Sequence, residues 1–167
     1  GTYNPSKFQT SDSACNPCPQ GQYCAQSGLT TYEGACAEGF YCTGSALIDR
    51  PYNSSYGGGE GPAGYYCVSG SSEATPCDDG SYTSTAGSSS CLPCPESNYC
   101  VNHAATPTTC PLGYYCPEGT GSDYIPCTKG TFSNRSIADQ DDCFSCTAGM
   151  YCPNAGMTAP ESACRAG

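Results

Sequence analysis

Large apolar side chains are few in this chain, and they do not follow one another in long runs. Leu, Ile, Val and Phe together number 13 among 167 residues, and Trp is absent. Thirteen such side chains cannot build an ordinary core, because the free energy of burying them falls well short of the ordering entropy. The apolar feature that recurs is a tyrosine directly before a cysteine, at Tyr23, Tyr41, Tyr66, Tyr99, Tyr115 and Tyr151.

The residues around these Tyr-Cys pairs predict the local structure. A glycine stands two residues before most of these tyrosines, and prolines flank many of the cysteines. Glycine permits a turn with positive φ, so the chain is expected to fold back there as a small hairpin. Proline stiffens loops and blocks helix. We therefore expect short two-stranded ribbons and irregular loops with almost no helix. We expect the tyrosine rings to pack against disulfides as a substitute core.

Cysteine is the residue type that can hold such a chain together. There are 17 cysteines, about one residue in ten. This density predicts disulfides and an oxidising compartment, so we expect an extracellular, secreted or cell-surface protein. It argues against a Rossmann domain, a helix bundle or a barrel enzyme. No apolar run approaches the roughly 18 residues that a membrane helix needs, so we expect no membrane span in this segment.

The charge of the chain narrows the classes of partner. Five Lys and Arg face 15 Asp and Glu, which gives a net charge of −10. Nucleic acid is not expected as a partner, because phosphate binding needs clustered cations. The single histidine, His103, lies in a loop with alanine, threonine and proline. No catalytic constellation is visible, so we expect neither an enzyme nor a cofactor.

Internal repetition is the strongest pattern in the sequence. One motif reads Cys-x-x-Cys-x-x-Gly-x-Tyr-Cys, and Ser97 replaces the glycine in one copy. It begins at three cysteines, Cys15, Cys91 and Cys143. A shorter form, Cys-x-x-Gly-aromatic-Tyr-Cys, begins at Cys36, at Cys110 and, with glycine in place of the first cysteine, at Gly61.

A second motif has Cys-x-x-Gly, then Ser or Thr, an aromatic residue, a polar loop and a cysteine. It runs from Cys77 to Cys91 and from Cys127 to Cys143. The chain opens on this motif without its first cysteine and closes at Cys164 on the missing half, so the two ends match head to tail. We expect three repeat units, at 1–79 with an insertion at 43–60, at 80–129, and at 130–167 in shortened form.

These motifs resemble the cysteine-rich repeat of tyrosine-kinase ephrin receptors, which is similar to modules of tumour-necrosis-factor receptors and has EGF-like relatives. The resemblance covers nearly the whole chain outside the insertion. It implies a small disulfide-rich fold of tandem repeats, built from short β-hairpins and loops. Since such units touch mainly their neighbours, we expect them to form an elongated rod.

The resemblance also implies disulfides. Two close longer loops, Cys77–Cys91 and Cys127–Cys143. For the other cysteines two arrangements remain open. The local arrangement pairs Cys18–Cys24, Cys36–Cys42, Cys94–Cys100, Cys110–Cys116 and Cys146–Cys152. The interleaved arrangement, as in tumour-necrosis-factor receptors, has Cys94–Cys110 and Cys100–Cys116.

The local arrangement leaves three cysteines, Cys15, Cys67 and Cys164. Cys15 and Cys164 are complementary half-motifs that could join neighbouring copies. Cys67 lacks its local partner because Gly61 stands at that position, so it could be free, pair with Cys15, or link to another chain. Zinc is the rival explanation for the Cys-x-x-Cys pairs. The regular Tyr-Cys that follows each pair favours disulfides and no metal.

Two functions fit this pattern. The first is a structural segment of an extracellular, glycosylated fibre, coat or appendage that self-associates head to tail as a filament. The alternative is a receptor or adhesion ectodomain that binds a protein ligand. N-glycans are expected at the sequons of Asn53 and Asn134, and O-linked sugars in the Ser- and Thr-rich stretches. Tyr52 and Tyr56 in the insertion could contact a neighbouring subunit or a sugar.

Overall fold

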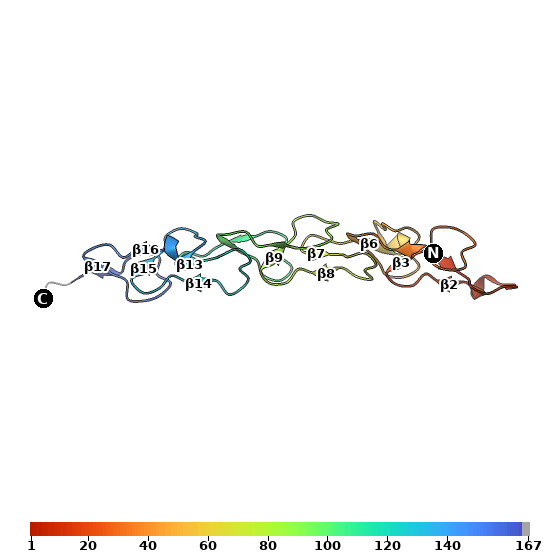
Figure 1. Cartoon of the computed structure of the whole chain (residues 1–167), viewed down its shortest axis with the longest axis horizontal. Coiled ribbons are helices and arrows are strands. Elements are labelled where there is room, and N and C mark those ends of the chain that lie inside the picture. Colours follow the sequence, from red (N-terminus) through yellow and green to blue (C-terminus); the bar gives the residue numbers. More distant parts are fainter. Residues whose placement is uncertain (165–167) are drawn as a thin grey trace. The chain divides into compact units, whose positions relative to one another are not determined.

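The computed structural model describes residues 1–164, which fold almost entirely as short antiparallel hairpins (Figure 1). Each hairpin has two strands of two or three residues, and no sheet has more than these two strands. Within these residues there is no α-helix, and the helical turns are three short 3-10 segments. The expected disulfide-rich fold of short ribbons and loops, with almost no helix, is confirmed.

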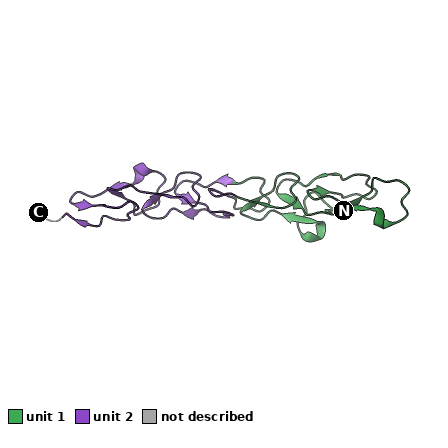
Figure 2. Ribbon diagram, turned by 90° about the horizontal axis from the view of Figure 1, so that it is seen from below, with its two compact units in different colours: residues 1–77, 83–91 green, residues 78–82, 92–167 purple. Residues whose placement is uncertain are grey.

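The chain divides into two compact units (Figure 2). Unit 1 consists of residues 1–77 and 83–91, and unit 2 of residues 78–82 and those from 92 onward. The contact pattern differs from the expected division into 1–79, 80–129 and 130–167, which stays a prediction because a repeat array can be cut at any phase.

Unit 1 contains four complete hairpins and two of the 3-10 segments. The segments are η1 (Asp12–Ala14) and η2 (Ser54–Tyr56). The hairpins are β1 (Thr2–Tyr3) with β2 (Asn16–Pro17), β3 (Gln22–Tyr23) with β4 (Gly34–Ala35), β5 (Phe40–Cys42) with β6 (Gly58–Glu60), and β7 (Tyr65–Tyr66) with β8 (Thr75–Pro76).

Unit 2 contains five strand pairs and η3 (Gln140–Asp142). The pairs are β9 (Ser81–Tyr82) with β10 (Leu92–Pro93), β11 (Asn98–Tyr99) with β12 (Thr108–Thr109), β13 (Tyr114–Tyr115) with β14 (Ile125–Pro126), β15 (Thr131–Phe132) with β16 (Phe144–Ser145), and β17 (Met150–Tyr151) with β18 (Ser162–Ala163).

A Cys-x-x-Gly turn precedes the first strand of most hairpins, and its glycine makes two backbone hydrogen bonds. Its glycine has positive φ, 75° at Gly21 and 84° at Gly113. The Gly21 carbonyl accepts the N–H of Cys36 at the end of its own hairpin, and the Gly21 N–H donates to the Cys42 carbonyl of the next hairpin. The same bonds recur within each unit, so one turn closes a hairpin and ties it to its neighbour.

The glycine of this turn is expected to matter most where another backbone approaches it. At Gly113 (φ 84°) an added Cβ would overlap the Gly156 carbonyl, whereas at Gly130 (φ 86°) nothing lies within 4 Å. Gly130→Ala should therefore cost only about 1 kcal/mol for the left-handed backbone, and Gly113→Ala clearly more. Urea unfolding of both variants checks this; equal losses would contradict the tight approach at Gly113.

Cysteine is the commonest buried hydrophobic residue in the described part of the chain. Among residues 1–164 nearly all of the buried hydrophobic side chains are cysteines, with Ala46, Ile137 and Pro51 beside them. In unit 1 the buried pair Cys36 and Cys42 packs with Ala46, and the Tyr23 ring lies against them. This is the expected arrangement, in which a tyrosine and a disulfide replace an aliphatic core.

Candidate functional site

Seven disulfides form the framework among residues 1–164. They have the local arrangement, and none interleaves two hairpins. Five close loops between cysteines six residues apart: Cys18–Cys24, Cys36–Cys42, Cys94–Cys100, Cys110–Cys116 and Cys146–Cys152. Two close longer loops: Cys77–Cys91 and Cys127–Cys143. Their Cα–Cα distances of 5.7–6.1 Å lie within the usual range for disulfides.

The type of residue that follows the aromatic position differs between the short and the long disulfide loops. Where a bonded cysteine follows the aromatic position, the disulfide closes a six-residue loop. In the two long-loop hairpins that position holds Thr83 or Ser133, which are 3% and 0% exposed. Both hydroxyls are satisfied, since Thr83 Oγ1 lies 2.6 Å from Ser88 Oγ and Ser133 Oγ donates to the Arg135 carbonyl. A small hydroxyl thus fills the site of the absent sulfur.

Cys67 is a buried thiol without a sulfur partner. Position 61, which holds the partner in the equivalent hairpins, is glycine, and a Cβ built there would lie 2.9 Å from Cys67 Sγ. Burial raises the pKa of the Cys67 thiol. Burial therefore favours the thiol over the reactive thiolate and keeps Cys67 away from solvent.

Cys15 and Cys164 are unpaired and exposed. In the strand register, Asn16 faces Tyr3 as Leu92 faces Tyr82, so Cys15 has the place that the bonded Cys91 has in its own hairpin. Cys15 lines a surface pocket of about 330 Å³. A link from Cys15 or Cys164 to another copy stays a prediction.

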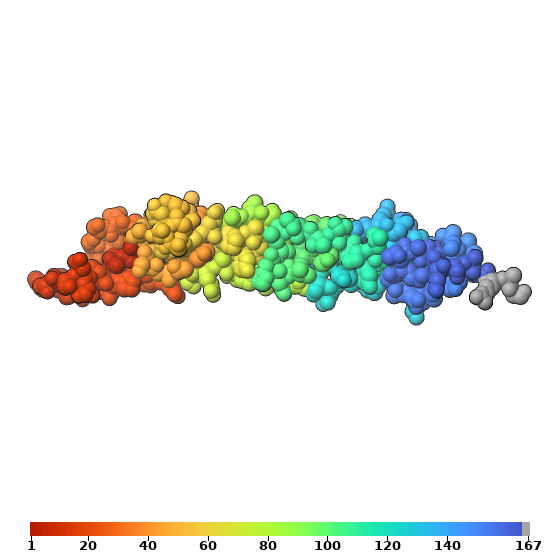
Figure 3. Space-filling view, turned by 180° about the vertical axis from the view of Figure 1, so that it is seen from behind, coloured from red at the N-terminus to blue at the C-terminus, as the bar shows by residue number. Residues whose placement is uncertain are grey.

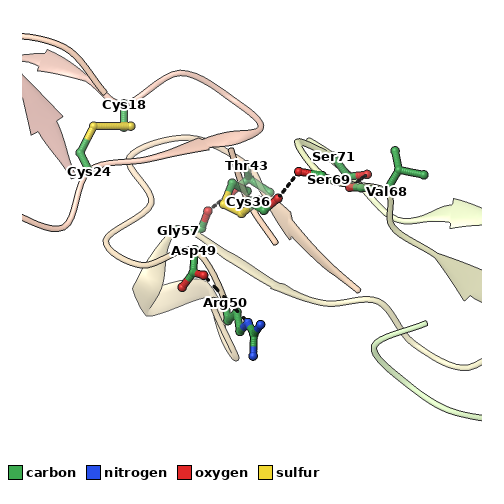
Figure 4. Close-up of a disulfide and its surroundings, with 11 residues drawn as sticks. Cys18, Cys24, Cys36, Thr43, Asp49, Arg50, Gly57, Val68, Ser69 and Ser71 are labelled. Atoms are coloured by element: carbon green, nitrogen blue, oxygen red, sulfur yellow. Dashed lines mark hydrogen bonds and ion pairs between the residues drawn. A yellow bond between two sulfur atoms is a disulfide. The ribbon is translucent and has the colours of Figure 1, made fainter. Parts of the chain in front are cut away.

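Two side-chain hydrogen bonds lie close to the Cys36–Cys42 disulfide (Figure 4). The carbonyl of Cys36 accepts the Ser69 hydroxyl of a later hairpin at 3.3 Å. Thr43 Oγ1 donates to the Gly57 carbonyl at 3.2 Å and so closes the base of the insertion. These contacts hold the loops against the sulfur framework.

In unit 2, Asp79 forms hydrogen bonds with Ser122, which lies 43 residues later in the sequence. Its carboxylate accepts both the hydroxyl of Ser122, at 2.6 Å, and the Ser122 N–H, at 2.8 Å. The Ser122 bonds, with a weaker one from the Asn102 backbone, hold the pKa of Asp79 below its usual value.

Acidification is therefore expected to weaken these hydrogen bonds. Because the folded-state pKa is lower than the unfolded-state pKa, the stabilisation is complete above about pH 4 and is lost as the pH falls through the folded value. Asp79→Asn should remove this pH dependence near Ser122, and Asp78→Asn should leave it unchanged. Hydrogen exchange around Ser122 at pH 5 and pH 2.5 measures this acid sensitivity. Identical acid responses of both variants would contradict a stabilising role of the Asp79–Ser122 hydrogen bonds.

The insertion at 43–60 is a structured element and stands at the surface, coloured orange to yellow in Figure 3. Asn53 caps η2, and Gly57 ends η2 with a left-handed φ of 79°. Pro51 is fully buried. The rings of Tyr52 and Tyr56 lie 4.5 Å apart, with Tyr52 62% exposed, and their hydrogen bond raises the pKa of Tyr52.

Both sequons lie on exposed loops. Asn53 is exposed at the start of η2, and Asn134 is exposed in the loop between β15 and β16. Nothing in these positions prevents a sugar from reaching solvent, although their surroundings differ.

The described residues contain no group of three or more His, Cys, Asp or Glu side chains that could hold a metal ion. In each Cys-x-x-Cys pair the second cysteine is bonded to the cysteine six residues later; these are Cys18, Cys94 and Cys146. Across residues 1–164 no helix has the length and apolar character that crossing a membrane requires.

The middle of the chain matches a known protein family. Residues 64–109 match the family described as tyrosine-protein kinase ephrin type A/B receptor-like. The matched segment spans the strands β7 to β12 and contains Cys77–Cys91 and Cys94–Cys100. A search of curated proteins finds none that matches.

Proposed function

We propose, from the premise that this is a cysteine-rich protein with an ephrin receptor-like repeat, that it forms part of a receptor or adhesion ectodomain that recognises a protein ligand. The match of residues 64–109 carries this proposal. Disulfide-rich repeats of this type suit an extracellular or cell-surface location. The match favours this function over the fibre, coat or filament subunit that the head-to-tail pattern suggested. No observation on the described residues supports self-association.

The charge of the chain specifies what the ligand should carry. With a net charge of −10, the chain would attract a partner with a basic surface and repel an acidic one. Such complementarity acts mainly on the association rate and falls with ionic strength. The proposed role is binding, with no catalytic step.

Binding to extracellular proteins tests the proposal. The oxidised chain, immobilised through a terminal tag, is exposed to purified cell-surface and secreted proteins while binding is followed by surface plasmon resonance. We expect saturable binding to a basic partner, with an association rate that drops as salt rises. A reduced and alkylated chain is the matched control and should not bind.

Electron microscopy of the native material separates the two functions. Discrete particles, together with antibody labelling of intact cells, agree with an ectodomain. Fibres with a regular axial repeat, and no saturable binding to any extracellular protein, would overturn it in favour of the structural role.

A further inference from the structure

The two sequons differ in how firmly the fold holds them. In the first, the Asn53 Oδ1 accepts the Ser55 N–H at 3.0 Å, a contact within a single turn. Ser55 is exposed. A bond from Nδ2 to a sugar leaves this Oδ1 contact in place, so the cap of η2 and a glycan at Asn53 are compatible.

The second sequon is held by its neighbours. The Ser136 hydroxyl donates to the Cys110 carbonyl at 2.8 Å and is half-buried. The Arg135 guanidinium lies 4.9 Å from the centre of the Phe144 ring. To enter the active site of an enzyme that attaches N-glycans, residues 134–136 would have to lose both contacts.

The disulfides add a further difference between the sequons. Asn134 lies inside the loop that Cys127–Cys143 closes. Asn53 lies inside none, because the disulfides on either side of it join Cys36 to Cys42 and Cys77 to Cys91. A closed loop limits the conformations open to a sequon, and no such closure restrains residues 53–55.

From this contrast we infer that Asn53 is the N-glycosylation site of the chain. We infer also that formation of the Cys127–Cys143 disulfide prevents glycosylation of Asn134. The sugar donor is a lipid-linked oligosaccharide diphosphate. The amide Nδ2 bonds to the anomeric carbon, the bond from that carbon to the phosphate oxygen breaks, and Nδ2 loses one proton as the lipid diphosphate leaves. The inference rests on the extracellular location in the proposed function.

Expression of the full chain behind a cleavable signal in secretory eukaryotic cells provides the test. Peptide mass spectrometry after amidase release, which converts a glycosylated Asn to Asp, measures both sites. Asn53 should be occupied in most molecules and Asn134 several-fold less. Ser55→Ala should remove the glycan at Asn53, whereas Ser136→Ala should leave the total glycan mass nearly unchanged.

A disulfide variant tests the protection directly. Cys127→Ser with Cys143→Ser should raise Asn134 occupancy several-fold without changing Asn53. The matched control, Cys146→Ser with Cys152→Ser, opens a loop without a sequon and should change neither site. Occupancy is read on total cell protein, so a variant that fails to fold or leave the cell still gives a result.

Three outcomes would overturn the inference: an unmodified Asn53, an Asn134 occupied as fully as Asn53 in the native sequence, or an Asn134 occupancy that ignores the loss of Cys127–Cys143. Because the signal places the chain in the secretory pathway, these outcomes are independent of whether the chain binds a protein ligand.

Discussion

Gly61→Cys is expected to form an additional disulfide with Cys67 and to stabilise the hairpin of β7 and β8 by about 2 kcal/mol, as loop closure over six residues predicts. A Cβ at position 61 would lie 2.9 Å from Cys67 Sγ. In a disulfide, the distance from the Cβ of one cysteine to the Sγ of the other is about 3 Å, given an S–S bond of about 2.05 Å. The sulfur of Cys67 is thus already placed for the bond.

Two measurements check this first prediction. Mass spectrometry should show the loss of two hydrogens from the oxidised variant, and hydrogen exchange should show slower opening around residues 61–77. Gly61→Ala is the matched control, because it adds the crowded Cβ without a sulfur and should destabilise. A variant that keeps two free thiols under oxidising conditions would contradict the proposed equivalence of positions 61 and 67 with the bonded pairs.

Loss of the Cys36–Cys42 disulfide should be the most damaging change at a six-residue loop. Replacing both cysteines by alanine removes about 2 kcal/mol of loop constraint. It also leaves a cavity against Ala46 and Tyr23, at a further cost of about 1 kcal/mol. We expect a loss of about 3 kcal/mol, centred on the hairpins of β3 and β5.

The same double substitution at Cys146 and Cys152 provides the comparison. The sequence separation is six in both cases, but Cys146 is only half-buried. The expected loss is about 2 kcal/mol, confined to the hairpin of β17 and β18 because repeats touch mainly their neighbours. Hydrogen exchange read hairpin by hairpin distinguishes the two variants. Equal losses would mean that packing on the sulfur adds nothing.

The hairpins could be predicted from the sequence because their signals are local. The glycine before each aromatic residue marks the turn, and Gly21 and Gly113 have the positive φ that it requires. Ser97 shows the limit of that signal, since it takes a φ of 61° at the same position without being glycine. Backbone hydrogen bonds hold Ser97 there, one from the Cys110 N–H at the end of its own hairpin and one to the Cys116 carbonyl of the next hairpin.

The choice between local and interleaved disulfides could not be made from spacing. Both arrangements join cysteines that the sequence brings near one another, and the choice depends on how consecutive hairpins stack. Cys100 donates its N–H to the Thr120 carbonyl, and Ser97 donates its N–H to the Cys116 carbonyl, both in the next hairpin. These contacts across hairpins have no signature in a single sequence.

The insertion at 43–60 shows a signal that the sequence analysis missed. Its composition is rich in Gly, Ser and Tyr, yet Asn53 before two serines and Gly57 after Tyr56 are the cap residues of a short helical turn. In contrast, the contact between Asp79 and Ser122 spans 43 residues and could be found only in the structure.

Hydrogen exchange before and after complete reduction tests the central claim most directly, because protection reports which parts of a chain stay folded. If disulfides hold these residues in place of an apolar core, reduction and alkylation should abolish protection in every hairpin, and a metal chelator without reductant should change nothing. Protection that survives full reduction, or that a chelator alone removes, would contradict the account.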